Sequence, residues 1–168
     1  MVKVLLILAA ADGGLRAHVL QLATVLGQAG HQVVLAGPAE TLLTAGITGD
    51  DATGLYTTHR LTALSLMQLR RIARQVGVVH AHGLKAGALA VLLTRSTRVV
   101  VTLHNRPVGG KPVRLIGWLL AKIAIHADSL LVVSTDLGDW LKQIGARSVE
   151  RALIPAPPTK TTTADTAQ

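Results

Sequence analysis

Two alternating hydrophobic patterns constrain the fold of this chain more than any other feature of its sequence. Six short runs rich in valine, leucine and isoleucine predict strands that are buried on both faces. They lie at Val2–Leu8, Gln32–Ala36, Val78–Ala81, Arg98–Leu103, Ser129–Val133 and Val149–Ile154. Segments with apolar residues at helical spacing lie between them, at Leu15–Ala29, Leu61–Gln75, Leu84–Thr94, Arg114–His126 and Thr135–Ile144. The alternation predicts an α/β fold, a doubly wound and mainly parallel sheet with helices on both faces.

The chain has the size and composition of one domain. It has 168 residues, 49% of them hydrophobic, which is enough for a real core. We expect this domain to span residues 1–154, with a loop-rich connection at 38–59 that has room for a short helix at 39–45 and a weak strand near 55–58. The final segment, "PAPPTKTTTADTAQ", has no apolar periodicity and contains prolines that cannot continue a helix or a ladder. Residues 155–168 are therefore predicted to be a linker or a frayed tail.

The sequence favours a cytoplasmic chain that does not span a bilayer. There is no cysteine, so no disulfide framework or cysteine-based zinc site is expected. The opening "MVKVLLILAAA" is short for a signal peptide, and a buried strand is the better interpretation. The longest apolar stretch, Leu115–Ile125, is interrupted by Gly117 and Lys122 and falls short of the roughly 20 residues that a spanning helix needs.

Basic residues are concentrated in one interval that has no acid. The formal net charge is +8, yet there is no aspartate or glutamate between Ala52 and Ala127. The same interval holds five histidines and these lysines and arginines: Arg60, Arg70, Arg71, Arg74, Lys85, Arg95, Arg98, Arg106, Lys111, Arg114 and Lys122. Exposed helix faces that aid solubility would explain some of them. The complete absence of acids favours an anionic partner: phosphate groups or an acidic membrane. Nucleic acid is disfavoured, because two tryptophans, one tyrosine and no phenylalanine offer few stacking platforms.

The stretch "ADGGLRAHV" places Gly13 and Gly14 between the first strand and the first helix. Glycines leave backbone N–H groups uncovered beside a helix N-terminus, where a phosphate can approach. The motif is neither G-x-G-x-x-G nor a Walker A loop, so NAD binding and ATP hydrolysis lose support. A tight turn that needs positive φ at one glycine is an equally good explanation from these residues alone.

Three histidines are expected to meet at the carboxyl edge of the sheet. His80 and His82 are two apart in "VVHAHG", so they project from one strand face, and His104 ends the run "RVVVTLH". A zinc site would use such a set, but metal-bound imidazoles usually need an orienting carboxylate, and this interval has none. We therefore expect no metal, and hydrogen bonding to phosphate or sugar hydroxyls instead. His18, one turn into the first helix, faces either the sheet or the cleft.

In order and spacing, five pieces of the chain resemble the N-terminal domain of retaining family 4 (group 1) glycosyltransferases. These pieces are "GGLRAHVLQLATVLGQAGHQVVLAGP", "VVHAHGLKAGALA", "VVVTLHN", "ADSLLVVSTDLGDWLKQIGA" and "ERALIPAPP". The resemblance covers roughly residues 2 to 158. It implies one Rossmann-like half of a GT-B enzyme, the acceptor-side half. The family's C-terminal signature is a pair of glutamates separated by seven residues, which Glu40 and Glu150 do not form. The resemblance thus implies that the donor-binding domain is absent from this sequence and acts as a partner.

The resemblance also implies roles for the glycines and for His104. Gly13 and Gly14 would lie beside the diphosphate of a nucleotide-sugar donor, and His104 would be the catalytic histidine near the transferred sugar. No tightly bound cofactor is implied. In the family's accepted retaining scheme the leaving phosphate takes the acceptor proton, so no carboxylate nucleophile is needed. The 168 residues alone are expected to transfer no sugar.

Acceptor binding is expected on the strand histidines and on one basic helix. By resemblance His82 would line the cleft towards the acceptor, with His80 on the same strand face. Arg70, Arg71 and Arg74 could meet a phosphorylated acceptor or an acidic membrane, which predicts a chain that sits peripherally on the inner face of the membrane.

Two functions fit these observations, and a third is disfavoured. The first is the N-terminal half of an enzyme that moves a sugar to a lipid-linked or other anionic acceptor. The alternative is a stand-alone acceptor- or membrane-binding module that works with a separate donor domain. A nucleotide-sugar epimerase or dehydrogenase is disfavoured, because Tyr56 is followed four residues on by Arg60 and not by the lysine of a Tyr-x-x-x-Lys pair.

Overall fold

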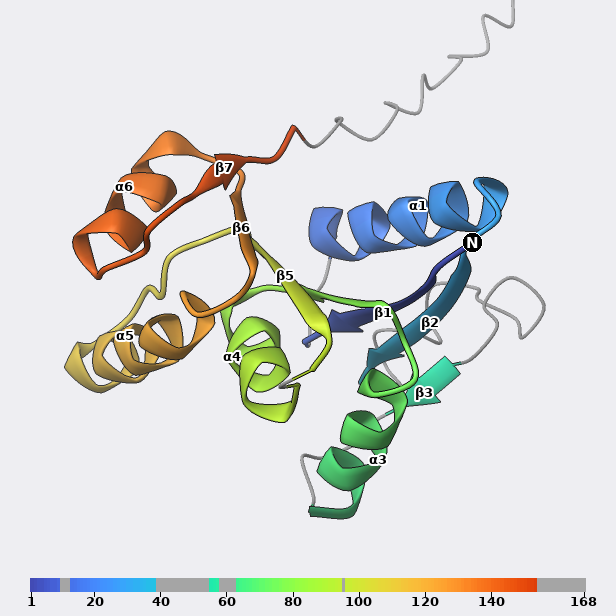
Figure 1. The fold of residues 1–168 in the computed structure, drawn as a ribbon. Helices are drawn as coiled ribbons and strands as arrows, with labels where there is room; N and C mark the ends of the chain where they lie inside the picture. Colours follow the sequence, from blue (N-terminus) through green and yellow to red (C-terminus); the bar gives the residue numbers. More distant parts are fainter. Residues whose placement is uncertain (10–12, 39–54, 58–62, 95, 154–168) are drawn as a thin grey trace, which may run out of the picture.

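The computed structural model describes residues 1–9, 13–38, 55–57, 63–94 and 96–153, which form a parallel α/β sheet covered by helices (Figure 1). The seven strands of the sheet are β1 Lys3–Leu8, β2 Gln32–Gly37, β3 Leu55–Thr57, β4 Val78–His82, β5 Arg98–Leu103, β6 Ser129–Val132 and β7 Glu150–Arg151. Their spatial order is β3-β2-β1-β4-β5-β6-β7, and every pair is parallel. The predicted doubly wound fold is confirmed.

Helices cover both faces because side chains alternate across each strand. The helices are α1 Gly14–Gln28, α3 Ala63–Ala73, α4 Leu84–Leu93, α5 Lys111–Ala124 and α6 Thr135–Gln143. Figure 1 shows α1 on one side of the sheet and α3, α4 and α5 on the other. In β1, Leu6 and Leu8 pack with Val19 of α1, whereas Leu5 and Ile7 belong to the core on the opposite face. The α6 helix packs against β6 and β7.

The weak strand expected near 55–58 is observed, because Leu55–Thr57 pairs with β2. Two other elements differ from the sequence-based expectation. The α5 helix begins at Lys111 and not at Arg114, because Pro112 suits a first helical turn and Gly110 is its N-cap. The last strand is only two residues long. The possible helix at 39–45 and the tail at 155–168 lie outside the described residues.

The topology makes one edge of the sheet the natural place for a ligand. Strand β1 pairs with β2 on one side and with β4 on the other, so the chain direction of the crossovers reverses between β1 and β4. Ligands of open α/β sheets bind outside the carboxyl ends of the strands at such a switch point. At these carboxyl ends, Leu8, His82 and Thr102 form one cross-strand row. Within the described part of the chain, no helix is long and apolar enough to cross a membrane.

Candidate functional site

Four histidines meet at the carboxyl edge of the sheet, on the face covered by α1. His80 and His82 come from β4 and stack with ring centroids 4.2 Å apart. His104 directly follows β5, and its ring centroid lies 6.0 Å from that of His82. His18 of α1 points its ring at both, at 5.7 Å from His82 and 6.0 Å from His104. The predicted meeting of the three strand histidines is thus observed, and His18 joins them; we call these four residues the histidine cluster.

The cluster contains buried ring nitrogens that lack hydrogen-bond partners. His80 is satisfied, because its Nε2 lies 2.8 Å from Thr102 Oγ1. His82 has no exposed surface, yet neither of its ring nitrogens has a partner among the described residues, and Nε2 of His104 also has none. Buried polar atoms are almost always hydrogen-bonded, and an exception calls for a reason. Unpaired nitrogens of this kind can bind hydroxyl or phosphate groups, and of the two residues His104 is the partly exposed one, whereas His82 lies enclosed behind it.

The imidazoles of the cluster are neutral near pH 7. Burial lowers the pKa of His82 to about 2, and the neighbouring imidazoles add to the shift. Burial likewise lowers the pKa of His80 to about 4 and that of His104 to about 4, with repulsion from His18 as a smaller cause. The pKa of His18 is also lowered by burial. A neutral imidazole has one donor and one acceptor nitrogen, so each can donate to an oxygen without placing a full charge in the site.

Replacing His82 with leucine is expected to stabilise the fold. The side chains have similar volumes, and the change removes two buried nitrogens that have no partner. Each such group costs about 1–3 kcal/mol and each kcal/mol shifts the melting temperature of a domain of this size by about 2–4 °C, so the melting temperature should rise by at least about 4 °C. Thermal unfolding of the chain measures this, with His126→Leu as an exposed control that should leave the temperature nearly unchanged. A clear loss of stability in His82→Leu would mean that the fold itself requires this histidine.

Three helix N-termini open on the same edge as the histidine cluster. The α1, α4 and α5 helices each follow the carboxyl end of a strand, and their N-caps are Gly13, Gly83 and Gly110. In these three helices no side chain caps the first turn and no acid lies in it. Among the described residues, no side-chain cap or first-turn acid therefore covers the orphan N–H groups or the positive end of each helix dipole, which attract an anion such as a phosphate.

Gly13 and Gly14, which the sequence could not tell apart, differ in backbone conformation. Gly13 has φ 63°, in the left-handed region, so the turn itself requires glycine there. Gly14 does not have a positive φ, and a Cβ built on it meets no described atom within 4 Å. The turn explains Gly13. The turn does not explain Gly14. A side chain there would fill the open space beside the first N–H groups of α1.

The three arginines of α3 do not reach the histidine cluster. Arg70, Arg71 and Arg74 are all exposed. They lie at and just beyond the C-terminal end of α3, which leads into the amino end of β4, whereas the histidines lie at the carboxyl ends of the strands. The length of the sheet separates the two groups. Their predicted contact with an acceptor stays a prediction.

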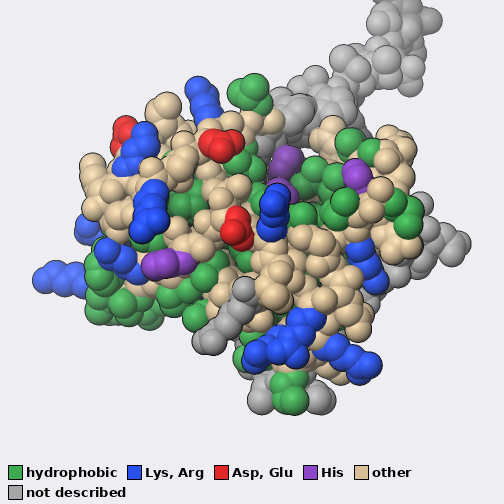
Figure 2. All heavy atoms as spheres, viewed as in Figure 1, with side chains coloured by type: hydrophobic (Ala, Val, Ile, Leu, Met, Phe, Trp, Pro, Cys, Tyr) green, Lys and Arg blue, Asp and Glu red, His purple; other side chains and the backbone are tan. Residues whose placement is uncertain are grey.

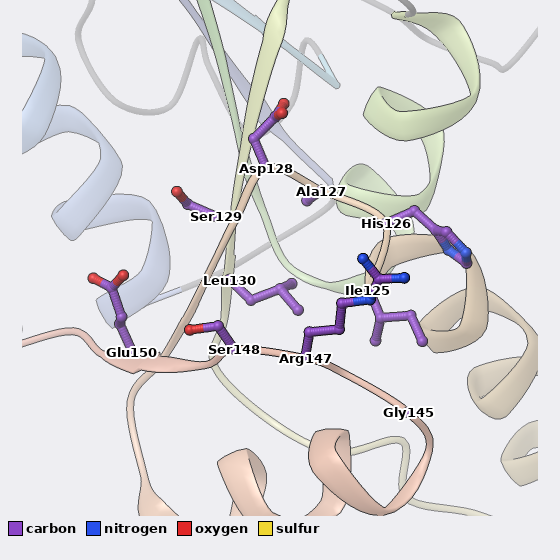
Figure 3. Close-up of a pocket in the computed structure, with 10 residues that line it drawn as sticks. All are labelled: Ile125, His126, Ala127, Asp128, Ser129, Leu130, Gly145, Arg147, Ser148 and Glu150. Carbon is purple, nitrogen blue, oxygen red and sulfur yellow. The ribbon is translucent and has the colours of Figure 1, made fainter.

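A cavity of about 510 Å³ lies at the amino edge of the sheet, away from the cluster (Figure 3). It is bounded by the turn before β6 and by the segment that leads into β7. Asp128 already has a structural partner there, because the Val99 N–H donates to its Oδ2 at 2.7 Å. Arg147, Ser148 and Glu150 add mixed charge and polarity without a buried unpaired group. We assign no function to this cavity.

Among the described residues, no three His, Asp or Glu side chains are grouped so as to hold a metal ion.

Sequence reasoning assigned no site role to two members of this arrangement. His18 follows Gly14 by one helical turn, and that spacing is a weak indication that both lie on the same end of α1. Thr102 gave no such indication, because its contact with His80 depends on the register of β4 against β5. Register is a tertiary property that no local pattern displays.

A sequence profile described as Glycosyltransferase Family 4 matches residues 12–156, most of the chain and all four histidines. The chain belongs to glycosyltransferase family 4. No curated protein sequence matches it significantly. Similar solved structures include HepE of Anabaena in complex with UDP-glucose, at TM-score 0.70 and 17% identity over 93% of this chain and 44% of that one. Sucrose-phosphate synthase of Thermosynechococcus elongatus matches at TM-score 0.65 and 17% identity, over 92% of this chain and 48% of that one.

A third similar structure is MurG of Acinetobacter baumannii, at TM-score 0.58 and 16% identity over 90% of this chain and 45% of that one. At such identities the likeness shows the fold alone, and it is the fold of one half of a GT-B glycosyltransferase. This family 4 chain spans less than half the length of the three proteins.

Proposed function

We propose that this chain is the N-terminal, acceptor-side half of a retaining glycosyltransferase that moves a sugar from a nucleotide-diphosphate sugar to a lipid-linked or other anionic acceptor. The observation that carries the proposal is the cluster of neutral, partly unpaired histidines beside the uncapped N-terminus of α1. Membership of glycosyltransferase family 4 supports it. So does the structural likeness to HepE, which was solved in complexes with UDP and with UDP-glucose.

The N-terminus of α1 would stabilise the departing diphosphate. Gly14 leaves the first N–H groups of the helix open, and hydrogen-bond donors fixed in advance at a developing charge are a large source of rate enhancement. The leaving phosphate itself would accept the proton of the acceptor hydroxyl on the same face of the sugar. No carboxylate nucleophile is needed from this domain, which agrees with the absence of acids between Ala52 and Ala127.

The histidines would position the sugar and the acceptor. His104, at the rim of the cluster, would donate a hydrogen bond to the transferred sugar, and His82 and His80 would line the acceptor side. Neutral imidazoles suit this task, since they bind hydroxyl groups without attracting the diphosphate away from α1. The nucleotide-sugar is a substrate in this scheme, with no tightly bound cofactor. A C-terminal donor-binding domain would supply the contacts to the nucleotide.

The basic end of α3 would meet a membrane and not the reacting groups. Arg70, Arg71 and Arg74 lie at the edge opposite the histidines, so an acidic lipid surface fits them better than the reactive end of an acceptor. We accordingly propose a cytoplasmic protein that associates peripherally with the inner face of the membrane.

His104→Ala in the full-length enzyme is expected to lower kcat by about 10- to 100-fold, because it removes one positioned donor. The KM for the nucleotide-sugar should change little, since most donor contacts lie on the other domain. Sugar transfer to the acceptor, followed with a labelled donor, measures both constants. His126→Ala, an exposed histidine at the other edge of the sheet, is the matched control.

Two results would contradict the scheme. One is an unchanged kcat in His104→Ala. The other is sugar transfer above background by the 168-residue chain alone, because the proposal places the donor-binding groups on a partner domain.

A further inference from the structure

Helix α5 has its small residues inside and its large apolar residues outside. Gly117, Ala121 and Ala124 are buried against the rest of the domain. Leu115, Ile116 and Leu119 are exposed by 58%, 56% and 49%. A surface helix of a globular domain normally turns its large apolar side chains to the core and polar ones to water. Figure 2 shows the apolar side chains gathered over the region of α5.

The loop before α5 extends this apolar surface and is packed in place. A Cβ on Gly117 would overlap Pro107, so the loop lies tightly on the helix. A Cβ on Gly109 would lie only 3.1 Å from Val113. Val108, between these two contacts, is nevertheless 90% exposed. We define the α5 face by its six exposed apolar residues: Val108, Val113, Leu115, Ile116, Trp118 and Leu119.

Basic residues border the α5 face, and neither α5 nor its neighbour α4 contains an acid. Lys111, Arg114 and Lys122 all lie on the helix, and the Lys122 Nζ is 5.4 Å from the Trp118 ring centroid. The neighbouring helix α4, which packs against α5, adds Lys85 and no acid. In Figure 2 the Asp and Glu side chains seen on this side of the molecule lie over other elements. The surface therefore combines exposed aliphatic residues, a tryptophan and positive charge.

We propose that the α5 face docks on the surface of an anionic lipid bilayer, with the helix axis lying along the membrane plane. Aliphatic residues and tryptophan of an amphipathic helix enter the boundary between headgroups and acyl chains, while lysine and arginine bind the acidic headgroups. A second copy of the chain fits this surface less well. A symmetric contact would bring Lys111, Arg114 and Lys122 of two copies together without an intervening acid, which is repulsive.

Docking would also orient the histidine cluster. Lys111, the first residue of α5, follows His104 by only seven residues at the carboxyl edge of the sheet. Because α3 and α5 cover the same side of the sheet, docking through α5 would place that side on the membrane and leave the carboxyl edge, with its histidines, open along the bilayer surface to a lipid-linked acceptor (Figure 1). This consequence depends on the proposed function, whereas the docking itself rests on the α5 face alone.

Co-sedimentation of the chain with lipid vesicles tests the docking. The chain is expected to bind vesicles of phosphatidylcholine that contain about 30% phosphatidylglycerol. Binding should be much weaker to phosphatidylcholine alone, and it should fall as salt is raised to about 0.5 M. No binding to the anionic vesicles would overturn the proposal, with no bearing on whether the full-length enzyme transfers sugar.

Leu115→Ser together with Leu119→Ser is expected to lower vesicle affinity by about tenfold or more, because each leucine loses apolar area buried in the lipid. Both positions are already exposed, so the melting temperature should stay nearly constant. Val25→Ser is the matched control, because Val25 is 53% exposed on α1 at the opposite face of the sheet. Equal losses in the control would overturn the proposal. So would a concentration-dependent dimer, seen by sedimentation, that the leucine substitutions abolish, since the face would then belong to a second copy.

Discussion

Lowering the pH from 7 to 5 is expected to destabilise the folded chain by about 2–4 kcal/mol through the buried histidines. The pKa of His80 is lowered to about 4 and that of His82 to about 2 in the folded state. In the unfolded chain both side chains return to a pKa near 6.5. Between pH 6.5 and about 4 the unfolded state therefore binds protons that the folded state does not, and stability falls as the pH falls. His104, which is less buried, adds to this slope in the same direction.

Urea unfolding at a series of pH values measures this effect. The window from pH 7 to 5 is informative because the carboxylates titrate mostly below it. His82→Leu should reduce the slope, since it removes one of the groups that resist protonation. A free energy of unfolding that is constant between pH 7 and 5 would mean that the folded cluster takes up protons as readily as the unfolded chain does. Burial would then not keep the imidazoles neutral, as the proposed mechanism requires.

Gly14→Val is expected to lower turnover of the full-length enzyme by about 10²–10³-fold and to leave the melting temperature within about 2 °C. The backbone at Gly14 accommodates a side chain, because φ is not positive and a Cβ there meets no described atom within 4 Å. The branched side chain would instead cover the first N–H groups of α1, where the diphosphate is proposed to bind. Turnover with a nucleotide-sugar and thermal unfolding of the same preparation separate the two effects.

Two other glycines of the same turn and helix provide the controls. Gly27→Val lies in the last turn of α1, where a Cβ also meets nothing, so both turnover and stability should stay close to the wild type. Gly13→Val forces a β-branched residue to φ 63° and should cost at least about 1–2 kcal/mol of stability. If Gly14→Val melts as early as Gly13→Val, both glycines serve only the turn. If its turnover equals that of Gly27→Val, the diphosphate lies elsewhere.

Most of the sheet could be predicted because its signals are local. The strand of Leu55–Thr57 was the weakest expectation, since three residues carry no periodicity, and its pairing with β2 decides it. The sequence predicted that α5 begins at Arg114, three residues after its observed start at Lys111. Pro112 lies in the first turn of the helix, but from sequence alone it did not identify that turn. Helix ends and short strands are the places where long-range contacts outweigh local preference.

The sequence by itself determined the parallel α/β fold, the placing of His80 and His82 on one strand face, and the acid-free character of the middle of the chain. Those properties follow from the periods of strand and helix and from composition, which neighbouring residues fix. Only the tertiary structure brought His18 to the strand histidines, left the nitrogens of His82 unpaired and separated the roles of Gly13 and Gly14. It also set the arginines of α3 at the far edge and turned the leucines of α5 outward. These features depend on strand register and on which helix face the core accepts, and contacts between distant segments decide both.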